Sequence, residues 1–120
     1  PENPVSGGVQ ALKEMPDLEL LFVGPKDLVE EELNKHEYDS DRVSILHAPQ
    51  IISMQDSASS VLKEKKDSSI ALGLQSHKEG KCHGFVSAGH TGALLTASTV
   101  FLGKIEGIYR PTIAAIFPTV

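Results

Sequence analysis

The amino-acid sequence predicts an α/β protein in which helices cover a mostly parallel sheet. Two observations support this class. Segments typical of strands alternate along the chain with segments typical of helices, and the strand segments are apolar at nearly every position rather than at every second one. Parallel strands that are buried on both faces have this continuous apolar character. At 120 residues, the chain is expected to form a single domain whose core needs neither disulfides nor a structural metal.

The first predicted element is a helix that begins at Pro4. Asn3 is its expected N-cap, because an Asn side chain can bind free backbone N–H groups and Pro at the first helical position loses no hydrogen bond. One face of the helix carries Val5, Val9, Leu12 and Met15. Gly7 and Gly8 each cost about 1 kcal/mol relative to alanine inside a helix. They indicate either that another backbone or a ligand comes close there or that the helix is merely weak.

Three further elements are predicted before residue 50. Residues 18–24 read LELLFVG and form a buried strand that ends at Gly24 and Pro25. Residues 26–34 form a short acidic helix, and a polar loop then leads to a second strand at 42–48. Apolar runs of this length that end at glycine or proline are typical of buried strands.

The second half of the chain is predicted to hold three helices and two strands. The helices span residues 58–65, 68–79 and 91–102, and the strands span 83–88 and 112–118. Asp67 is the expected N-cap of the middle helix and Gly80 its stop. Ile70, Leu74 and His77 lie on one face of that helix, and Leu94, Ala97 and Phe101 lie on one side of the next.

Composition and charge exclude several classes of function. A net charge of −5 argues against a broad nucleic-acid-binding surface. The single cysteine, Cys82, cannot form an internal disulfide, so a reducing, cytoplasmic setting is expected. No apolar run approaches the roughly 20 residues that span a bilayer, and neither a metal nor a cofactor is expected. Both ends of the sequence look cut, which suggests a partial α/β domain, 1–120, from a longer chain.

The segment FVSAGHTGAL, at residues 85–94, is the first candidate site. Ligands of open parallel sheets bind beyond the carboxyl ends of the strands, where loops enter helices. Gly89 and Gly92 allow unusual backbone angles and close approach by a ligand. Free amide groups at the start of the following helix favour an anion, and Ser87 and Thr91 add hydroxyl groups. A tight turn without a ligand explains the glycines equally well.

His90 lies inside this loop, where it could donate to a bound anion or act as an acid or base. A histidine that simply faces solvent is the plainer interpretation. The loop has no lysine of a nucleotide-binding P-loop, and no serine has the glycine spacing of a nucleophile elbow. Nucleotide hydrolysis is therefore poorly supported.

The segment KEKKDSS, at residues 63–69, is the second candidate site. Lys65 and Lys66 supply compact positive charge, and Asp67 can cap the next helix or orient a lysine. Ser68 and Ser69 place hydroxyl groups at the same helix start. A solvated junction between two helices is the alternative interpretation.

Four segments in order, ALKEMPDLELLFVG, KKDSS, FVSAGHTGALL and RPTIAAIFPT, resemble the bacterial phosphate acyltransferases of phospholipid synthesis, the PlsX family. The resemblance implies a three-layer α/β/α sandwich like that of isocitrate and isopropylmalate dehydrogenases, incomplete in this segment. It also implies the conversion of acyl-[acyl carrier protein] and inorganic phosphate to acyl phosphate. A homodimer in the cytoplasm with peripheral attachment to the membrane is implied as well.

The resemblance implies roles for individual residues. Lys66 and His90 are the expected catalytic residues, with Lys66 as the partner of the charge that develops during transfer. Phosphate or the developing oxyanion would be held by Asp67, Ser68, Ser69, Ser87, Gly89, Thr91 and Gly92. Arg110 is a weaker candidate for holding this charge, and a surface arginine before a strand is the plainer interpretation of it. Family members usually have Asn where this chain has His90, which leaves any role that needs an amide in doubt.

Two other functions stay open. One is a phosphotransacetylase-like enzyme that uses a coenzyme A thioester. The other is a fragment that binds an anion and catalyses nothing. The contact surface for an acidic carrier protein should be basic, whereas this segment is net acidic, so that surface is expected to lie outside it.

Overall fold

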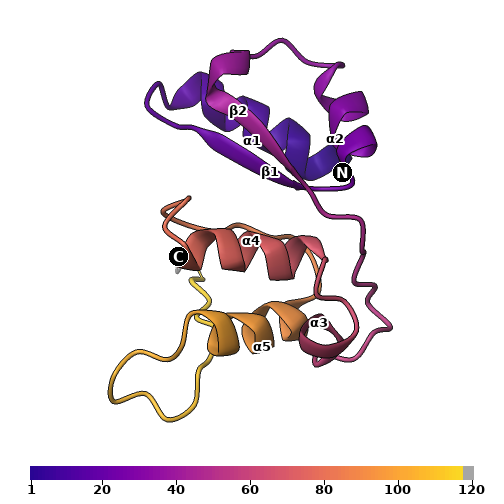
Figure 1. Ribbon diagram of the computed structural model, residues 1–120. Helices are drawn as coiled ribbons and strands as arrows, with labels where there is room; N and C mark the ends of the chain where they lie inside the picture. Colours follow the sequence, from indigo (N-terminus) through magenta and orange to yellow (C-terminus); the bar gives the residue numbers. More distant parts are fainter. Residues whose placement is uncertain (118–120) are drawn as a thin grey trace.

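The computed structural model describes residues 1–117 and contains a two-stranded parallel sheet with helices on both faces (Figure 1). The elements are α1 (Glu2–Glu14), β1 (Leu20–Gly24), α2 (Lys26–Leu33), the 3-10 helix η1 (Ser40–Arg42), β2 (Val43–His47), α3 (Ser60–Lys63), α4 (Ser69–Lys78) and α5 (Thr91–Phe101). In Figure 1, α4 lies below the strands and α5 lies below α4. The predicted α/β class is confirmed at this level.

The two strands pair in parallel from Leu20 opposite Val43 to Gly24 opposite His47. Their carboxyl ends therefore lie at the same edge of the sheet. The pairing continues by one hydrogen bond, in which the amide of Ala48 donates to the carbonyl of Gly24 at 2.8 Å. This edge is where ligand-binding loops of parallel sheets are found.

Helix α1 buries the predicted face of Val5, Val9 and Leu12. Val5 and Val9 pack with residues of α2 and the strands to form the core on one side of the sheet. Met15 does not extend this face, since it follows the helix and is half exposed. The helix packs tightly at Gly8, where a Cβ atom would lie 2.7 Å from Cζ of Phe22.

The prediction that Asn3 caps α1 is wrong. The helix begins at Glu2 with Pro1 at the N-cap, and no side chain caps it. The amide of Val5 makes the first helical bond, to the carbonyl of Pro1 at 3.1 Å. Pro4 is therefore the third residue of the helix and not the first, as predicted. It still lies in the first turn, where N–H groups have no helical partner, so the helix loses no hydrogen bond at this proline.

Arg42 caps the carboxyl end of α1. Its guanidinium donates to the carbonyl of Leu12 at 3.0 Å and to those of Met15 and Pro16 at 3.1 Å each. It also pairs with Asp39 at 3.3 Å. The last carbonyls of a helix lack helical partners and carry partial negative charge, so a forked cation there satisfies several of them at once.

Helices α3, α4 and α5 build a second core on the opposite side of the sheet, where α4 contacts β1. Its buried members are Val61, Ile70, Ala71, Leu74, Ala93 and Ala97. The side chain of Phe85 lies directly on Gly73, where any Cβ atom would collide with the ring. Helix α4 ends before Gly80, which has the predicted stop conformation with a φ of 76°.

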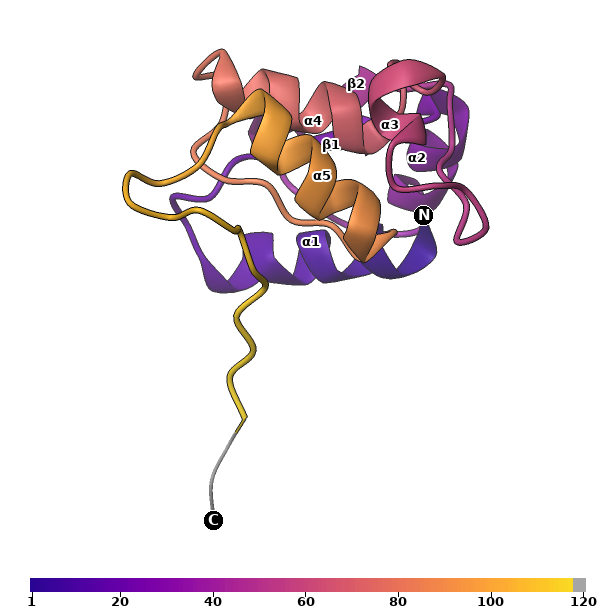
Figure 2. The same ribbon diagram turned by 90° about the horizontal axis from the view of Figure 1, so that it is seen from below.

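Two predicted strands do not form in the described residues. Residues 83–88 and 112–117 lie outside any strand, and Pro118 lies outside the described residues. Phe85 packs on α4 rather than beside a strand, and Val86 is 98% exposed. Figure 2 shows the segment after α5 extending away from the helices. An apolar extended segment becomes a strand only when a neighbouring strand accepts its hydrogen bonds.

Among the helices of residues 1–117, none has the length and apolar character needed to cross a membrane.

Candidate functional site

His90 is the N-cap of α5 through its side chain rather than a group that points freely into the loop. Its Nδ1 accepts a hydrogen bond from the amide of Ala93 at 3.1 Å, and its Nε2 lies 3.0 Å from the carbonyl oxygen of Asp56. An amide N–H can only donate, so Nδ1 carries no proton. Nε2 then carries the proton and donates it to Asp56. The two bonds fix one neutral tautomer and occupy both ring nitrogens.

Asp56 joins the two candidate segments. Its backbone carbonyl binds His90, and its Oδ2 accepts the amide of Ser53 at 2.6 Å and Nζ of Lys65 at 2.5 Å. Nζ of Lys65 also donates to the carbonyl of Ile51 at 2.7 Å. The hydrogen bond from Lys65, followed by that from Ser53, lowers the pKa of the Asp56 carboxyl below its ordinary value.

The start of α4 is held by Ser68 and not by the predicted Asp67. Ser68 is fully buried, and its Oγ accepts the amide of Ala71 at 3.3 Å. The amide of Asp67 instead binds Oε1 of Gln50 at 2.9 Å, while the amide of Gln50 binds the carbonyl of Asp67 at 3.3 Å. Ser and Asp are both good caps. Here the two hydrogen bonds to Gln50 hold the backbone of Asp67 before the helix, and Ser68 takes the cap position.

The amino ends of α4 and α5 lie on the same side of the molecule, next to α3 (Figure 1). The predicted glycine loop and the predicted lysine segment therefore meet in space, linked through Asp56 and Lys65. Lys66 and Asp67 are exposed there, and Ser69 is half-buried. Within residues 1–117, Lys66 makes no hydrogen bond or ion pair with the glycine loop.

A cavity of about 310 Å³ lies along α5 beside this helix start. Its lining residues are Ser87, Gly89, Thr91, Leu94, Leu95, Ser98 and Ile113. Three of these are predicted site residues. Ser87 and Thr91 bring hydroxyl groups to the start of the helix, and further along it Leu94 and Leu95 form a mainly apolar wall that also includes Ser98. Such a cavity suits a ligand with an anionic or polar head and an apolar body.

The two glycines of the loop act by their size and not by their backbone angles. In the described residues, only Gly80, Gly103 and Gly107 have positive φ, so the predicted unusual angles at Gly89 and Gly92 are wrong. A Cβ atom at Gly92 would lie 3.2 Å from Cε1 of His90. Tight packing against the ring explains why a glycine stands there.

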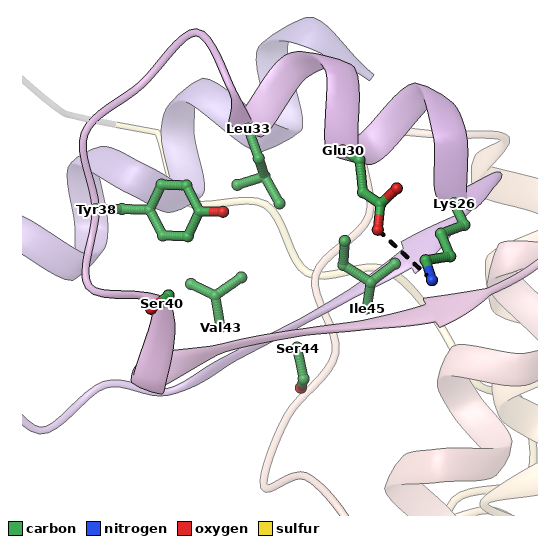
Figure 3. A pocket seen from close by; sticks show the side chains of 8 residues that line it. All are labelled: Lys26, Glu30, Leu33, Tyr38, Ser40, Val43, Ser44 and Ile45. Carbon is green, nitrogen blue, oxygen red and sulfur yellow. Dashed lines mark ion pairs between the residues drawn. The ribbon is translucent and has the colours of Figure 1, made fainter.

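A second cavity, of about 300 Å³, lies between α2 and β2 (Figure 3). Lys26 and Glu30 form an ion pair at its edge, with 3.6 Å between Nζ and Oε1. None of the predicted site residues lines this cavity. Residues 1–117 also contain no group of three or more His, Cys, Asp or Glu side chains placed to hold a metal ion.

Sequence reasoning missed Asp56 and Gln50. Both follow the second strand, at the sheet edge where loops of parallel sheets form sites. That position was the available signal, but the segment QIISMQDSASS, residues 50–60, has no glycine pattern to draw attention to it. The predicted partner of a lysine was Asp67, whereas the structure pairs Lys65 with Asp56.

Comparisons with known proteins agree with the resemblance seen in the sequence. Residues 1–120 match the model of the family described as fatty acid synthesis protein. Proteins named phosphate acyltransferase are similar to this chain: that of Clostridium tetani is 44% identical over 98% of the chain, and that of Halothermothrix orenii is 44% identical over 99%. The chain spans 35% and 36% of the lengths of these two relatives. The chain therefore belongs to the fatty acid synthesis protein family.

Proposed function

We propose that this chain is part of a phosphate acyltransferase that converts an acyl-[acyl carrier protein] and inorganic phosphate to acyl phosphate in phospholipid synthesis. The relatives named phosphate acyltransferase support the general reaction. The observation that carries the proposal for the site is the cavity along α5, which joins the hydroxyl groups of Ser87 and Thr91 to a mainly apolar wall of Leu94 and Leu95. A phosphate and an acyl group have these two characters.

In the proposed reaction, a phosphate oxygen attacks the thioester carbonyl carbon, and the carbon–sulfur bond then breaks. The carrier thiol leaves as a thiolate, which needs little acid assistance because free thiols have a pKa of about 8.5. Phosphate is largely anionic near neutral pH, so no strong base is needed. Positioning and stabilisation of charge are the main tasks of the protein.

The predicted residues divide these tasks. Ser87, Thr91 and the backbone at Gly89 and Gly92 hold phosphate at the start of α5. Within residues 1–117, the amides of Thr91 and Gly92 make no hydrogen bond, which leaves two donors at the positive end of the helix dipole.

Lys66 is exposed at the neighbouring helix start and supplies positive charge to the oxyanion. Asp67, Ser68 and Ser69 support it; Ser68 does so as the buried cap of α4. The proposed catalytic role of His90 is indirect, because both of its ring nitrogens are occupied and the side chain holds the start of α5 in place.

The remaining parts of the proposal concern the whole protein. The acyl donor is a carrier-protein thioester, the protein acts as a homodimer, and it works in the cytoplasm with peripheral attachment to the membrane. No nucleic acid takes part, which agrees with the net charge of −5.

Two substitutions in the complete protein that carries these residues test the site. Lys66→Ala removes the positive charge, and Gly92→Val pushes a branched side chain into His90. Each is expected to lower the rate of acyl phosphate formation by about 100- to 1,000-fold, the range for losing one group that stabilises an oxyanion. Lys78→Ala is the control, because Lys78 is exposed at the opposite end of α4.

Circular dichroism confirms that each variant is folded before its rate is compared. Rates near wild type for both folded variants would remove these loops from the mechanism. Carrier-protein and coenzyme A thioesters are compared in the same assay, and a preference for coenzyme A would favour the phosphotransacetylase-like alternative. Residues 1–120 are assayed beside the complete protein to determine whether the segment alone binds phosphate without catalysis.

A further inference from the structure

We propose that Asp56 is a positioning residue for the phosphate-binding start of α5, and that its ion pair with Lys65 sets the position of His90. The inference rests on the proposed function, since it assigns the groups that place the same site. It adds a residue from a loop that lies outside both candidate segments. Asp56 is 34 residues from His90 and nine from Lys65 in sequence.

The first step is the bond between Asp56 and His90. The Nε2–H of His90 donates to the Asp56 carbonyl at 3.0 Å, while Nδ1 accepts from Ala93 at 3.1 Å. Because the ring is rigid, the position of the Asp56 carbonyl determines where Nδ1 lies. It therefore determines where the first turn of α5 begins, and with it the two amides proposed to bind phosphate.

The second step is the anchoring of Asp56 itself. Its carboxylate binds Nζ of Lys65 at 2.5 Å and the amide of Ser53 at 2.6 Å. Nζ of Lys65 also binds the carbonyl of Ile51 at 2.7 Å. The Lys65 ammonium and the Asp56 carboxylate thus tie together residues 51, 53 and 56 of one loop and connect this loop to the residues that follow α3. These bonds hold in place the backbone carbonyl of Asp56, which accepts the hydrogen bond from His90.

The solvent exposure of the Lys65–Asp56 ion pair indicates whether it acts on folding or on binding. The side chains of Lys65 and Asp56 are 26% and 23% exposed, and ion pairs that retain contact with water add little to folding stability. A displaced binding group, by contrast, weakens binding of the ligand and raises KM even where folding is unaffected. Loss of the pair is therefore expected to act on phosphate binding more than on folding.

The test uses the complete protein with three variants. Asp56→Asn keeps an acceptor for Ser53 but removes the charge, Lys65→Met keeps the length of the stem, and Lys65→Arg restores a cation. Lys78→Met is the matched control, since it removes an exposed lysine from the far end of α4. Three quantities are measured: the dissociation constant of inorganic phosphate, the KM and kcat for acyl phosphate formation, and the ¹⁵N spectrum of His90.

The wild-type protein is expected to show a His90 ring with a proton on Nε2 and none on Nδ1. Asp56→Asn and Lys65→Met are expected to change this spectrum and to raise the KM for phosphate about tenfold with kcat within about twofold, as a displaced binding group would. Lys65→Arg and Lys78→Met are expected to stay near wild type in both quantities.

A proton on Nδ1 in the wild type would overturn the proposal, and so would Lys65→Met with an unchanged spectrum and phosphate affinity. Loss of affinity with equal loss in Lys65→Arg would also overturn it, because the charge would then not be the cause. If the wild type forms no acyl phosphate but its His90 spectrum and phosphate affinity respond as expected, the positioning role stands and the acyl transfer function fails.

Discussion

His90 performs two hydrogen-bonding tasks that an asparagine can perform in a related way. Its Nδ1 accepts the Ala93 amide and its Nε2–H donates to Asp56. An Asn side chain also has one acceptor and one donor group, with Oδ1 at the same distance from the backbone as Nδ1. Asn is a preferred N-cap, so the Asn that the resemblance leads us to expect at this position could hold the start of α5 in the same way. The donor of Asn is nearer the backbone, so the bond to Asp56 would be weaker.

Substitutions at His90 separate these two tasks. His90→Ala removes the cap and is expected to lower the free energy of unfolding of the complete protein by about 1 kcal/mol, the usual value for a lost cap. His90→Asn keeps the acceptor and is expected to lose less than half of that. Denaturant unfolding measures both. Equal losses in the two variants would show that the bond to Asp56, and not the cap, carries the contribution of His90.

The Asp56 carboxyl gives the folded protein a pH-dependent contribution. Lys65 and Ser53 stabilise the charged form, which lowers the pKa of Asp56 below its ordinary value of 3.8. A group whose pKa is lowered on folding binds fewer protons in the folded state than in the unfolded state. Its contribution is therefore complete above pH 3.8 and is lost as the pH falls from there through the lowered pKa.

Denaturant unfolding of wild type and Asp56→Asn between pH 7 and pH 2.5 tests this contribution. The difference in unfolding free energy is expected to be constant from pH 7 to about pH 5 and to shrink below 3.8, the ordinary pKa of the Asp56 carboxyl. Taking the difference between the two proteins cancels the other groups that titrate in acid. A difference that stays constant throughout would show that the lowered pKa of Asp56 contributes nothing to folding stability.

At the scale of elements, α1 shows that two adjacent glycines can have opposite roles. A Cβ atom at Gly8 would lie 2.7 Å from Cζ of Phe22 and 3.1 Å from Cδ1 of Leu20. A Cβ atom at Gly7 would meet nothing within 4 Å. Gly8 therefore permits the close approach of α1 to the sheet, whereas Gly7 only weakens the helix. The weak-helix interpretation therefore holds at Gly7, whereas the groups that approach Gly8 are side chains and not the backbone or ligand expected from the sequence.

Alanine substitutions at the two positions form a matched pair. Gly7→Ala is expected to raise the unfolding free energy by about 0.5–1 kcal/mol, because alanine is the better helix former and nothing obstructs it. Gly8→Ala gains the same propensity but must displace the Phe22 ring, so it is expected to lower stability by about 1–3 kcal/mol. Thermal unfolding monitored by circular dichroism measures both changes. Equal effects would mean that α1 does not pack on Phe22 as described.

At the scale of the whole molecule, the chain stacks two cores on the two faces of one short sheet. The layer of α4 and α5 contains both candidate segments, and the strands place the loop with Asp56 next to them. The aromatic side chains Phe22 and Phe85 each lie on a glycine of a helix, Gly8 and Gly73. Small residues in the helices therefore set how closely the layers approach.

The fold was predictable where its signals are local. The apolar face of α1, the stop at Gly80 and the first two strands depend on residues within a few positions of one another, and each is present in the structure. The strands predicted at 83–88 and 112–118 depend on a partner strand, which composition does not reveal. Val86 is 98% exposed, which shows that an apolar residue in an extended segment does not by itself form part of a strand.

The sequence by itself determined the α/β class of the fold and the order of its helices, and it predicted two segments that bind an anion. Only the tertiary structure decided which groups connect these segments: Asp56 to Lys65, Asp56 to His90, and Gln50 to Asp67. The reason is physical. Helix periods and turns arise from contacts within about four residues, whereas these bonds join groups 9 to 34 residues apart, and only folding brings such groups within hydrogen-bonding distance.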